Sequence, residues 1–291
     1  MATGSTSTFD QIFTVTSIGP GVTNFVFSGR INLIHPFDTT DRVPTNNTTR
    51  LSYSVTCLAP IHAEHMLDIR NRSLITTTQL YGGNDFRLGT DATVDGDVLI
   101  NGKVSLWSRA RIEGDLILAD SLMQQDGVVI TGSVIQGINT ANVKIPDKTV
   151  VAGSRDVTIN NDQSGSWAPG SYQNAMVRAR GILALTAGEY NFQSLRVEPD
   201  AEIVFDTSEG TIEVNVVREL ELGDRVQTSG ASPTTVKLYS NSTNAVRFGT
   251  NVEYGGALIA PFAHVHVFSQ TTAASHIWAD RITIEPDVIT N

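Results

Sequence analysis

Cysteine is almost missing from this chain of 291 residues, because Cys57 is the only one. An intrachain disulfide is therefore excluded, and the fold depends on burial of apolar side chains and on hydrogen bonds. Cys57 alternates with Leu51, Tyr53 and Val55, a spacing of two that places these side chains on one face of a strand. We interpret Cys57 as a buried thiol, because a nucleophilic cysteine needs a positive and partly exposed setting.

Long apolar runs and basic residues are also scarce. No run of about 18 apolar residues occurs, so no transmembrane helix and no membrane insertion are expected. The net charge is −10, and an acidic surface repels phosphate backbones, so nucleic acid is not an expected partner. The first residues contain neither the basic nor the apolar part of a signal peptide, and we favour a cell-surface or virion assembly over the cytoplasm.

The chain does contain an 18-residue repeat. Gly96, Gly114 and Gly132 are each 18 residues apart, and each precedes Asp or Ser and then aliphatic residues. Repeats this short have the size of one coil of a solenoid, in which neighbouring coils stack to bury a shared core. Short runs of Val, Ile and Leu between Gly, Asp and Asn favour strands and turns. The sequence predicts an all-β fold, a right-handed parallel β-helix (solenoid) with an N-terminal β domain or cap.

The repeat also predicts a core. Val98, Leu116 and Val134 occupy the same position in successive repeats, so we expect them to stack in one column inside the solenoid.

Other parts of the chain lack the repeat. We expect a polar tail over residues 1–8, an N-terminal β domain or cap over 9–83, and the solenoid over 84–291. Pro, Gly and Asn are frequent between residues 144 and 181, which predicts a loop-rich insertion there. The segment from Ala63 to Arg70 is the single short helix candidate. The polar tail buries too little apolar surface to fold alone, so we expect a neighbouring subunit to order it.

The C-terminal segment is strand-like and has no obvious cap. Ile282, Ile284 and Val288 form an apolar pattern close to the last residue. An uncovered last coil leaves backbone N–H and C=O groups without partners. We therefore expect these three residues to form an assembly surface, with a second copy of the chain as the partner in a homo-oligomer or polymer.

Three histidines near the C-terminus are candidate metal ligands. His264 and His266 share one face of a strand, and His276 belongs to the next predicted coil, an arrangement that suits zinc. No Cys, Asp or Glu repeats at the same spacing, so we expect no bound metal and no cofactor. His62 and His65 are also close in sequence, but they lack the spacing of the helical zinc-protease motif.

Acidic residues follow the diglycine at Gly82 and Gly83 and resemble one calcium-binding β-roll repeat. They are Asp85, Asp91, Asp95 and Asp97. Such repeats bind calcium when they occur in tandem, because each ion is shared between neighbouring turns. A single copy favours Asp residues that form turns through hydrogen bonds to the local backbone.

No catalytic residues are identified. Polysaccharide lyases and hydrolases with a β-helix fold use clustered carboxylates in a groove, but no acidic cluster recurs here at the 18-residue spacing beside aromatic residues. We expect a structural, self-assembling scaffold protein and not an enzyme. Two alternatives stay open: a particle-borne β-helical fibre that binds surface polysaccharide, and a carbohydrate-active β-helix enzyme.

Two stretches carry a family resemblance. Residues 92–104 and 110–116 contain the Gly-Asp-aliphatic step and resemble the bactofilins, polymer-forming bacterial cytoskeletal proteins. Residues 188–286 are similar to β-solenoid segments of bacterial surface and pilus-associated proteins. Bactofilins lack a domain like residues 9–80. The resemblance therefore implies a scaffold or polymer, and it does not imply a particular organelle.

Overall fold

The computed structural model describes residues 60–139, 144–273 and 276–290, and the backbone of four short strands within residues 1–59. The chain divides into two compact units, Met1–Cys57 and Leu58–Asn291. Every element described is a strand or a turn, and none is a helix that could cross a membrane. The all-β class predicted from the sequence is confirmed. Cys57 and the polar tail before Thr8 lie outside the described residues.

The first unit contains two antiparallel strand pairs. β1 pairs with β4, and β2 pairs with β3. Their bounds are Thr8–Phe9 (β1), Phe13–Val15 (β2), Phe25–Phe27 (β3) and Ile31–Asn32 (β4).

The second unit is a single sheet of 25 strands, and its strand pairs are parallel. The strands before residue 140 are β5 (Ile61–Ile69), β6 (Leu74–Gly82), β7 (Asp85–Leu88), β8 (Thr93–Ile100), β9 (Lys103–Leu106), β10 (Arg111–Ile112), β11 (Leu116–Leu118), β12 (Leu122–Gln124), β13 (Val129–Ile130) and β14 (Val134–Gln136). The strands after it are β15 (Val157–Ile159), β16 (Ser164–Ser166), β17 (Gly170–Val177), β18 (Ile182–Thr186), β19 (Gly188–Val197), β20 (Glu202–Asp206), β21 (Ile212–Leu222), β22 (Gln227–Ser229), β23 (Val236–Ser240), β24 (Val246–Phe248), β25 (Glu253–Tyr254), β26 (Ala257–Val267), β27 (Thr272–Ala273), β28 (His276–Ile284) and β29 (Ile289–Thr290).

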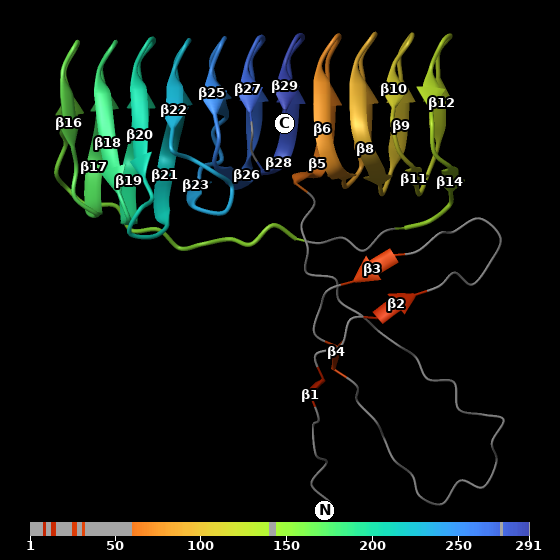
Figure 1. Cartoon of the computed structure of the whole chain (residues 1–291), viewed down its shortest axis with the longest axis horizontal. Helices are drawn as coiled ribbons and strands as arrows, with labels where there is room; N and C mark the ends of the chain where they lie inside the picture. Colours follow the sequence, from red (N-terminus) through yellow and green to blue (C-terminus); the bar gives the residue numbers. More distant parts are fainter. Residues whose placement is uncertain are drawn as a thin grey trace, which may run out of the picture. The chain divides into compact units, whose positions relative to one another are not determined.

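The strands are stacked in levels, because each one pairs with the equivalent strand of the next repeat (Figure 1). One ladder of partners runs through eleven levels: Gly170, Tyr190, Val214, Leu238, Leu258, Ile277, Ile61, Leu80, Val98, Leu116 and Val134. Val98, Leu116 and Val134 stack at the end of this ladder in the predicted register. Val98 and Leu116 are fully buried as expected, whereas Val134 is 46% exposed, because none of the described levels covers it, and so it does not lie inside the core.

The 18-residue repeat has a physical cause at one corner of each level. A Cβ atom on Gly114 would lie 2.6 Å from the carbonyl oxygen of Gly96, so only glycine permits this backbone approach. The next residue links the levels, since Asp97 Oδ1 accepts a hydrogen bond of 2.9 Å from the Asp115 N–H. Asp115 Oδ1 accepts one of 2.7 Å from the Ser133 N–H in the same way. The Gly-Asp step therefore serves level-to-level contact.

Chain order and spatial order differ. Residues 60–139 form one half of the stack and residues 153–290 form the other half. The C-terminal strands β28 and β29 pair with β5 and β6 of the first half, in the middle of the row of strands (Figure 1). We call this contact the seam.

The seam overturns the expected C-terminal assembly surface. Ile282 pairs with Leu67 and Ile284 pairs with Ile69, and both isoleucines are fully buried. Val288 is buried as well, and its carbonyl accepts a hydrogen bond from the Leu74 N–H. The chain's own first level covers its last one, so this prediction was wrong.

The predicted boundaries also shift. β5 and β6 belong to the stack, so it begins near residue 60 and not at residue 84. The segment from Ala63 to Arg70, the helix candidate, lies almost entirely in β5. Within the predicted insertion at 144–181, residues 144–156 contain no strand, and regular levels resume at β15.

A connecting segment lies between the two halves of the stack in the sequence. Its described part after β14, residues 144–152, which we call the strap, runs along the row of strands (Figure 1). Ile145 packs against Tyr239 on the outer face of the sheet, and the Tyr239 hydroxyl donates to the Pro146 carbonyl at 3.2 Å. Lys148 Nζ lies 2.9 Å from the Glu213 carboxylate. These contacts hold the strap on the sheet.

The connection from Gly137 to Gly153 is nearly as short as its path allows. The Gly153 N–H donates to the Tyr172 carbonyl. Gly153 therefore lies one level beyond Gly170, at the end of the ladder opposite to Val134. Eleven spacings of about 4.8 Å separate the two levels, or roughly 53 Å. The sixteen residue steps from Gly137 to Gly153 span at most about 53–58 Å when fully extended. The connection therefore has almost no slack.

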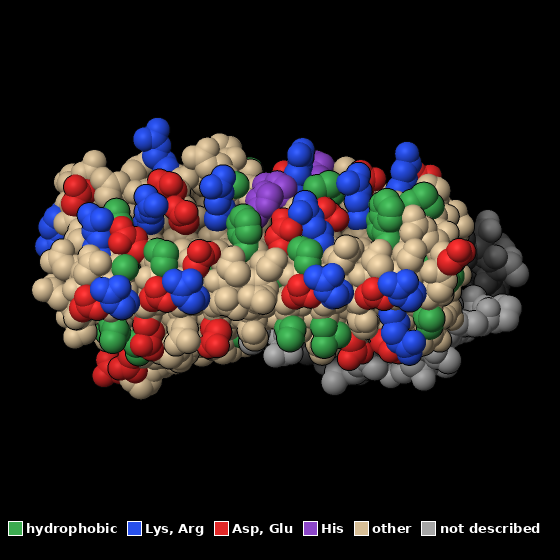
Figure 2. Space-filling view, turned by 90° about the horizontal axis from the view of Figure 1, so that it is seen from above, with side chains coloured by type: hydrophobic (Ala, Val, Ile, Leu, Met, Phe, Trp, Pro, Cys, Tyr) green, Lys and Arg blue, Asp and Glu red, His purple; other side chains and the backbone are tan. Residues whose placement is uncertain are grey.

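A column of ten residues with positive φ follows another corner of the stack. Asp and Arg alternate along it, apart from two amides in the middle. In spatial order the column contains Asp162, Arg180, Asp200, Arg225, Asn251, Gln270, Asp287, Arg72, Asp91 and Arg109. Each Arg makes a two-bond pair with one Asp, at 2.5–2.8 Å. Figure 2 shows such pairs in a row along the stack.

The ion pairs of this column predict that the melting temperature depends on pH in the acid range. The hydrogen bond from Arg72 lowers the pKa of Asp287 below its ordinary value of 3.8. A carboxyl with a lowered pKa contributes stability above the unfolded pKa, and this contribution is lost as the pH falls through the folded pKa. We expect Arg72→Gln to melt at a lower temperature than the parent at pH 6, and the difference to shrink below about pH 3.8.

Melting temperatures measured from pH 6 to pH 2 check this. Arg87→Gln, outside the column, is the control and should show no such convergence with the parent. A difference between parent and Arg72→Gln that stays constant over the whole range would contradict the prediction.

Candidate functional site

The seam contains a β-bulge that brings three chemically active side chains together. Ala63 pairs with Ala279 and Met66 pairs with Arg281, so two residues of β5 stand opposite the single residue Asp280 of β28. The two residues are Glu64 and His65. Bulges of this kind turn side chains out of the normal alternation and are frequent beside functional sites.

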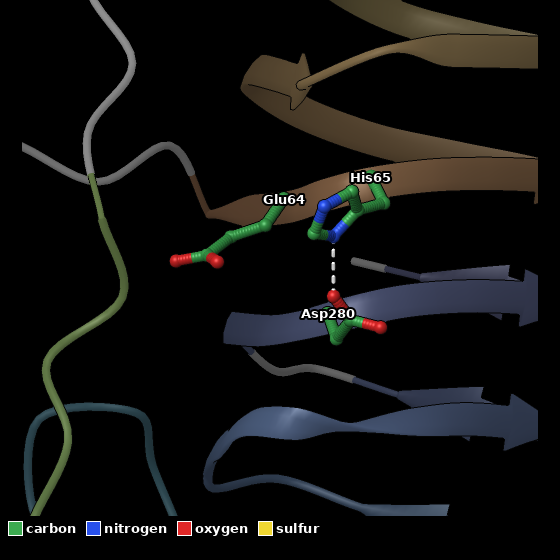
Figure 3. Close-up of side chains that lie close together, drawn as sticks. All are labelled: Glu64, His65 and Asp280. Atoms are coloured by element: carbon green, nitrogen blue, oxygen red, sulfur yellow. Dashed lines mark hydrogen bonds and ion pairs between the residues drawn. The ribbon is translucent and has the colours of Figure 1, made fainter.

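The three side chains converge from segments far apart in sequence. Figure 3 shows His65 directed toward Asp280 across the seam, while Glu64 extends toward the strap. His65 Nδ1 is hydrogen-bonded to Asp280 Oδ1. Glu64 Oε1 accepts a hydrogen bond of 2.7 Å from the Ile145 N–H of the strap. One ligand atom from each of the three lies within 4.8 Å of the others.

The side chains of this cluster are of types that can bind a metal ion. An imidazole nitrogen and two carboxylates form a ligand set that divalent transition metals accept. In the part of the chain that the structure describes, no other three His, Cys, Asp or Glu side chains lie this close together. Sequence reasoning missed the cluster, because Asp280 is 215 residues from His65.

The structure brings together two of the three histidines predicted as candidate metal ligands. His266 Nε2 lies 3.1 Å from His264 Nδ1, and His264 Nε2 lies 2.8 Å from the Thr283 hydroxyl. His276 pairs with Ala257 at the start of β26 and belongs to a different ladder. The expected group of three imidazoles on one face is therefore wrong, because the bend within β26 separates the two ladders.

Burial keeps these imidazoles neutral. Desolvation lowers the pKa of His264, and the neighbouring His266 lowers it further. Burial is also the main cause that lowers the pKa of His266 and the one cause that lowers the pKa of His276. All three values fall below the ordinary 6.5, so the rings carry no charge near pH 7.

The acidic residues that resemble a calcium repeat have structural partners. Asp91 forms an ion pair with Arg109, and Asp97 accepts a hydrogen bond from the Asp115 N–H. Asp85 and Asp95 are exposed side chains on different strands. This agrees with Asp residues that stabilise turns and levels.

The level formed by β12, β13 and β14 is a second candidate site. Within residues 60–139, 144–273 and 276–290, each of these strands pairs through one edge, with β9, β10 and β11 respectively. Apolar side chains of this level are exposed: Met123 by 50%, Val129 by 40%, Val134 by 46% and Ile138 by 47%. Free strand edges beside exposed apolar side chains are typical of a pairing surface.

The opposite end of the stack has a different character. Its end level contains β15, with the sequence Val157-Thr158-Ile159, and β16, with the polar sequence Ser164-Gly165-Ser166. Trp167 closes the core there, is only 9% exposed, and lies 5.9 Å from Phe192 between ring centroids. The Trp167 ring therefore covers the core at this end of the stack.

Two open grooves on the surface of the stack are large enough for a polysaccharide segment. The larger has a volume of about 520 Å³ and is lined by Glu202 and Glu253 with Arg180 and Arg225, and by no aromatic residue. The smaller, of about 350 Å³, has Phe268 as its one aromatic lining residue. Neither groove offers the paired aromatic platforms expected of a sugar-binding fibre.

Comparison of the chain with models of protein families, with curated proteins and with solved structures found no match.

Proposed function

We propose that the chain is a right-handed parallel β-solenoid that serves as a structural subunit and self-associates through its open end level, β12 to β14. Right-handedness is the rule for parallel strands joined by crossovers. The supporting observation is the set of three strands with a free edge beside exposed Met123, Val129, Val134 and Ile138.

Edge pairing satisfies two needs of this level together. A second copy supplies partners for the free N–H and C=O groups and covers the exposed apolar side chains. The seam supports this mechanism, since there two separate segments of one chain join by parallel pairing of the same kind. At the opposite end Trp167 and Ile159 are buried, whereas the level of β12 to β14 exposes its apolar side chains, so this level is the preferred contact.

The polysaccharide-binding fibre and the carbohydrate-active enzyme stay alternatives. Each needs a groove with stacking aromatics or uncompensated carboxylates. In the larger groove Arg180 and Arg225 lie among the acids Asp200, Glu202 and Glu253, and no aromatic residue lines it. The scaffold proposal is therefore favoured.

A charge at the open end should abolish self-association. Val134→Glu places a carboxylate beside the free edge of β14, and desolvation of that charge opposes pairing with a second copy. We expect the parent to form oligomers or filaments and the variant to stay monomeric, by light scattering and electron microscopy. Val151→Glu is the matched control, because Val151 is 74% exposed on the strap and away from this level.

Circular dichroism of both variants should stay that of the parent. A monomeric parent at high concentration, or equal loss of assembly in both variants, would contradict the proposal.

A further inference from the structure

We propose that Glu64, His65 and Asp280 bind one divalent transition metal ion, with Zn²⁺ as the best-fitting ion, and that this ion ties the seam to the strap. The ligand set joins a borderline nitrogen donor to two oxygen donors, which zinc accepts in four-coordinate geometry with water in the remaining position. The proposal is independent of self-association through β12 to β14.

The bulge supplies the first part of the argument. In regular alternation Glu64 and His65 would point to opposite faces of the sheet. The extra residue in β5 opposite Asp280 places both side chains at one corner, with ligand atoms within 4.8 Å of each other. Two ligand atoms on one zinc ion are about 3.3 Å apart. The cluster therefore needs only small side-chain rotations to close around an ion.

His65 and Asp280 are free to make those rotations. The His65 side chain is 54% exposed and the Asp280 side chain is 24% exposed. An ion bound between His65 Nδ1 and Asp280 Oδ1 would replace the hydrogen bond that joins these two atoms.

Neighbouring groups orient the two carboxylates. Glu64 Oε1 accepts the hydrogen bond from the Ile145 N–H, which leaves Oε2 as the metal ligand. Asp280 Oδ2 lies 3.5 Å from Arg281 Nε, which leaves Oδ1 toward His65. Outer contacts of this kind fix ligand geometry in metal sites. Two carboxylates and one imidazole also give the site a net negative charge that attracts a cation.

Zinc should bind with a stoichiometry of one per chain. We expect isothermal titration of the chelator-treated full chain with Zn²⁺ alone to show one site. His65→Gln and Asp280→Asn should each weaken binding at least tenfold. Glu64→Gln keeps an oxygen acceptor for the Ile145 N–H and removes the charge, so it should also weaken binding while the strap contact stays.

The second imidazole cluster provides the control. The double variant His264→Gln and His266→Gln should bind Zn²⁺ like the parent. Zinc should also raise the melting temperature of the parent and of this control, and leave His65→Gln unchanged. Absence of binding, loss of binding in the double variant, or unchanged binding in Glu64→Gln would overturn the three-ligand site.

Discussion

Leu116→Asp should lower the free energy of unfolding by about 5 kcal/mol, which is close to the entire stability of many domains. Leu116 is fully buried and stacks between Val98 and Val134 in the central ladder. A carboxylate there has no cationic partner and no access to water, and the leucine's packing is lost as well. Urea unfolding followed by circular dichroism measures the change.

Val134→Asp is the matched control, because it makes the same chemical change one level further along the same ladder. Val134 is 46% exposed, so its carboxylate stays hydrated and the expected loss is below about 1 kcal/mol. Equal destabilisation by the two substitutions would show that the level of Val134 is covered. Equal tolerance of both would show that the register of the ladder is wrong.

Gly96→Ala should have the second largest effect, with a loss of about 3 kcal/mol or more. A Cβ atom on Gly96 would lie 1.8 Å from the Thr77 carbonyl oxygen, so the backbones of two levels would have to separate. The φ of Gly96 is +149°, which side-chain-bearing residues rarely adopt. Thermal melting and urea unfolding should both report the loss.

Gly137→Ala separates the steric clash between levels from the conformational penalty of a positive φ. Gly137 also has a positive φ, +85°, but an added Cβ would have no atom within 4 Å. Only the conformational penalty remains, about 1–2 kcal/mol. If Gly96→Ala and Gly137→Ala lose equal stability, the close approach between levels contributes nothing.

Local features of the fold could be predicted from the sequence. The spacing of Gly96, Gly114 and Gly132 carries the level-to-level backbone contact, and each contact involves consecutive repeats. For that reason the all-β class and the stacking of Val98 with Leu116 are confirmed. The arginines and aspartates of the positive-φ corner also recur once per level. Their spacing in the sequence varies with the length of each level, so no fixed period revealed them.

Features that depend on distant pairing could not be predicted. The bulge in β5 leaves residues 64–66 unburied between buried Ala63 and Leu67, which interrupts the alternation expected of a strand. The same bulge creates the cluster of Glu64, His65 and Asp280. Nothing in the local pattern around Ile282 indicates that its cover comes from residues 61–69, since no short-range periodicity connects segments separated by 215 residues.

The short connection between the two halves makes the number of levels in the stack depend on the length of the segment between Gly137 and Gly153. Proteins built from stacked repeats commonly change length by gain or loss of a repeat, and their ends accept this freely. Here an added level in either half would lengthen by about 4.8 Å the distance that the chain between Gly137 and Gly153 has to cover, and that connection has almost no spare length. Each duplication would therefore require an insertion of one or two residues in a part of the sequence far from the duplicated level.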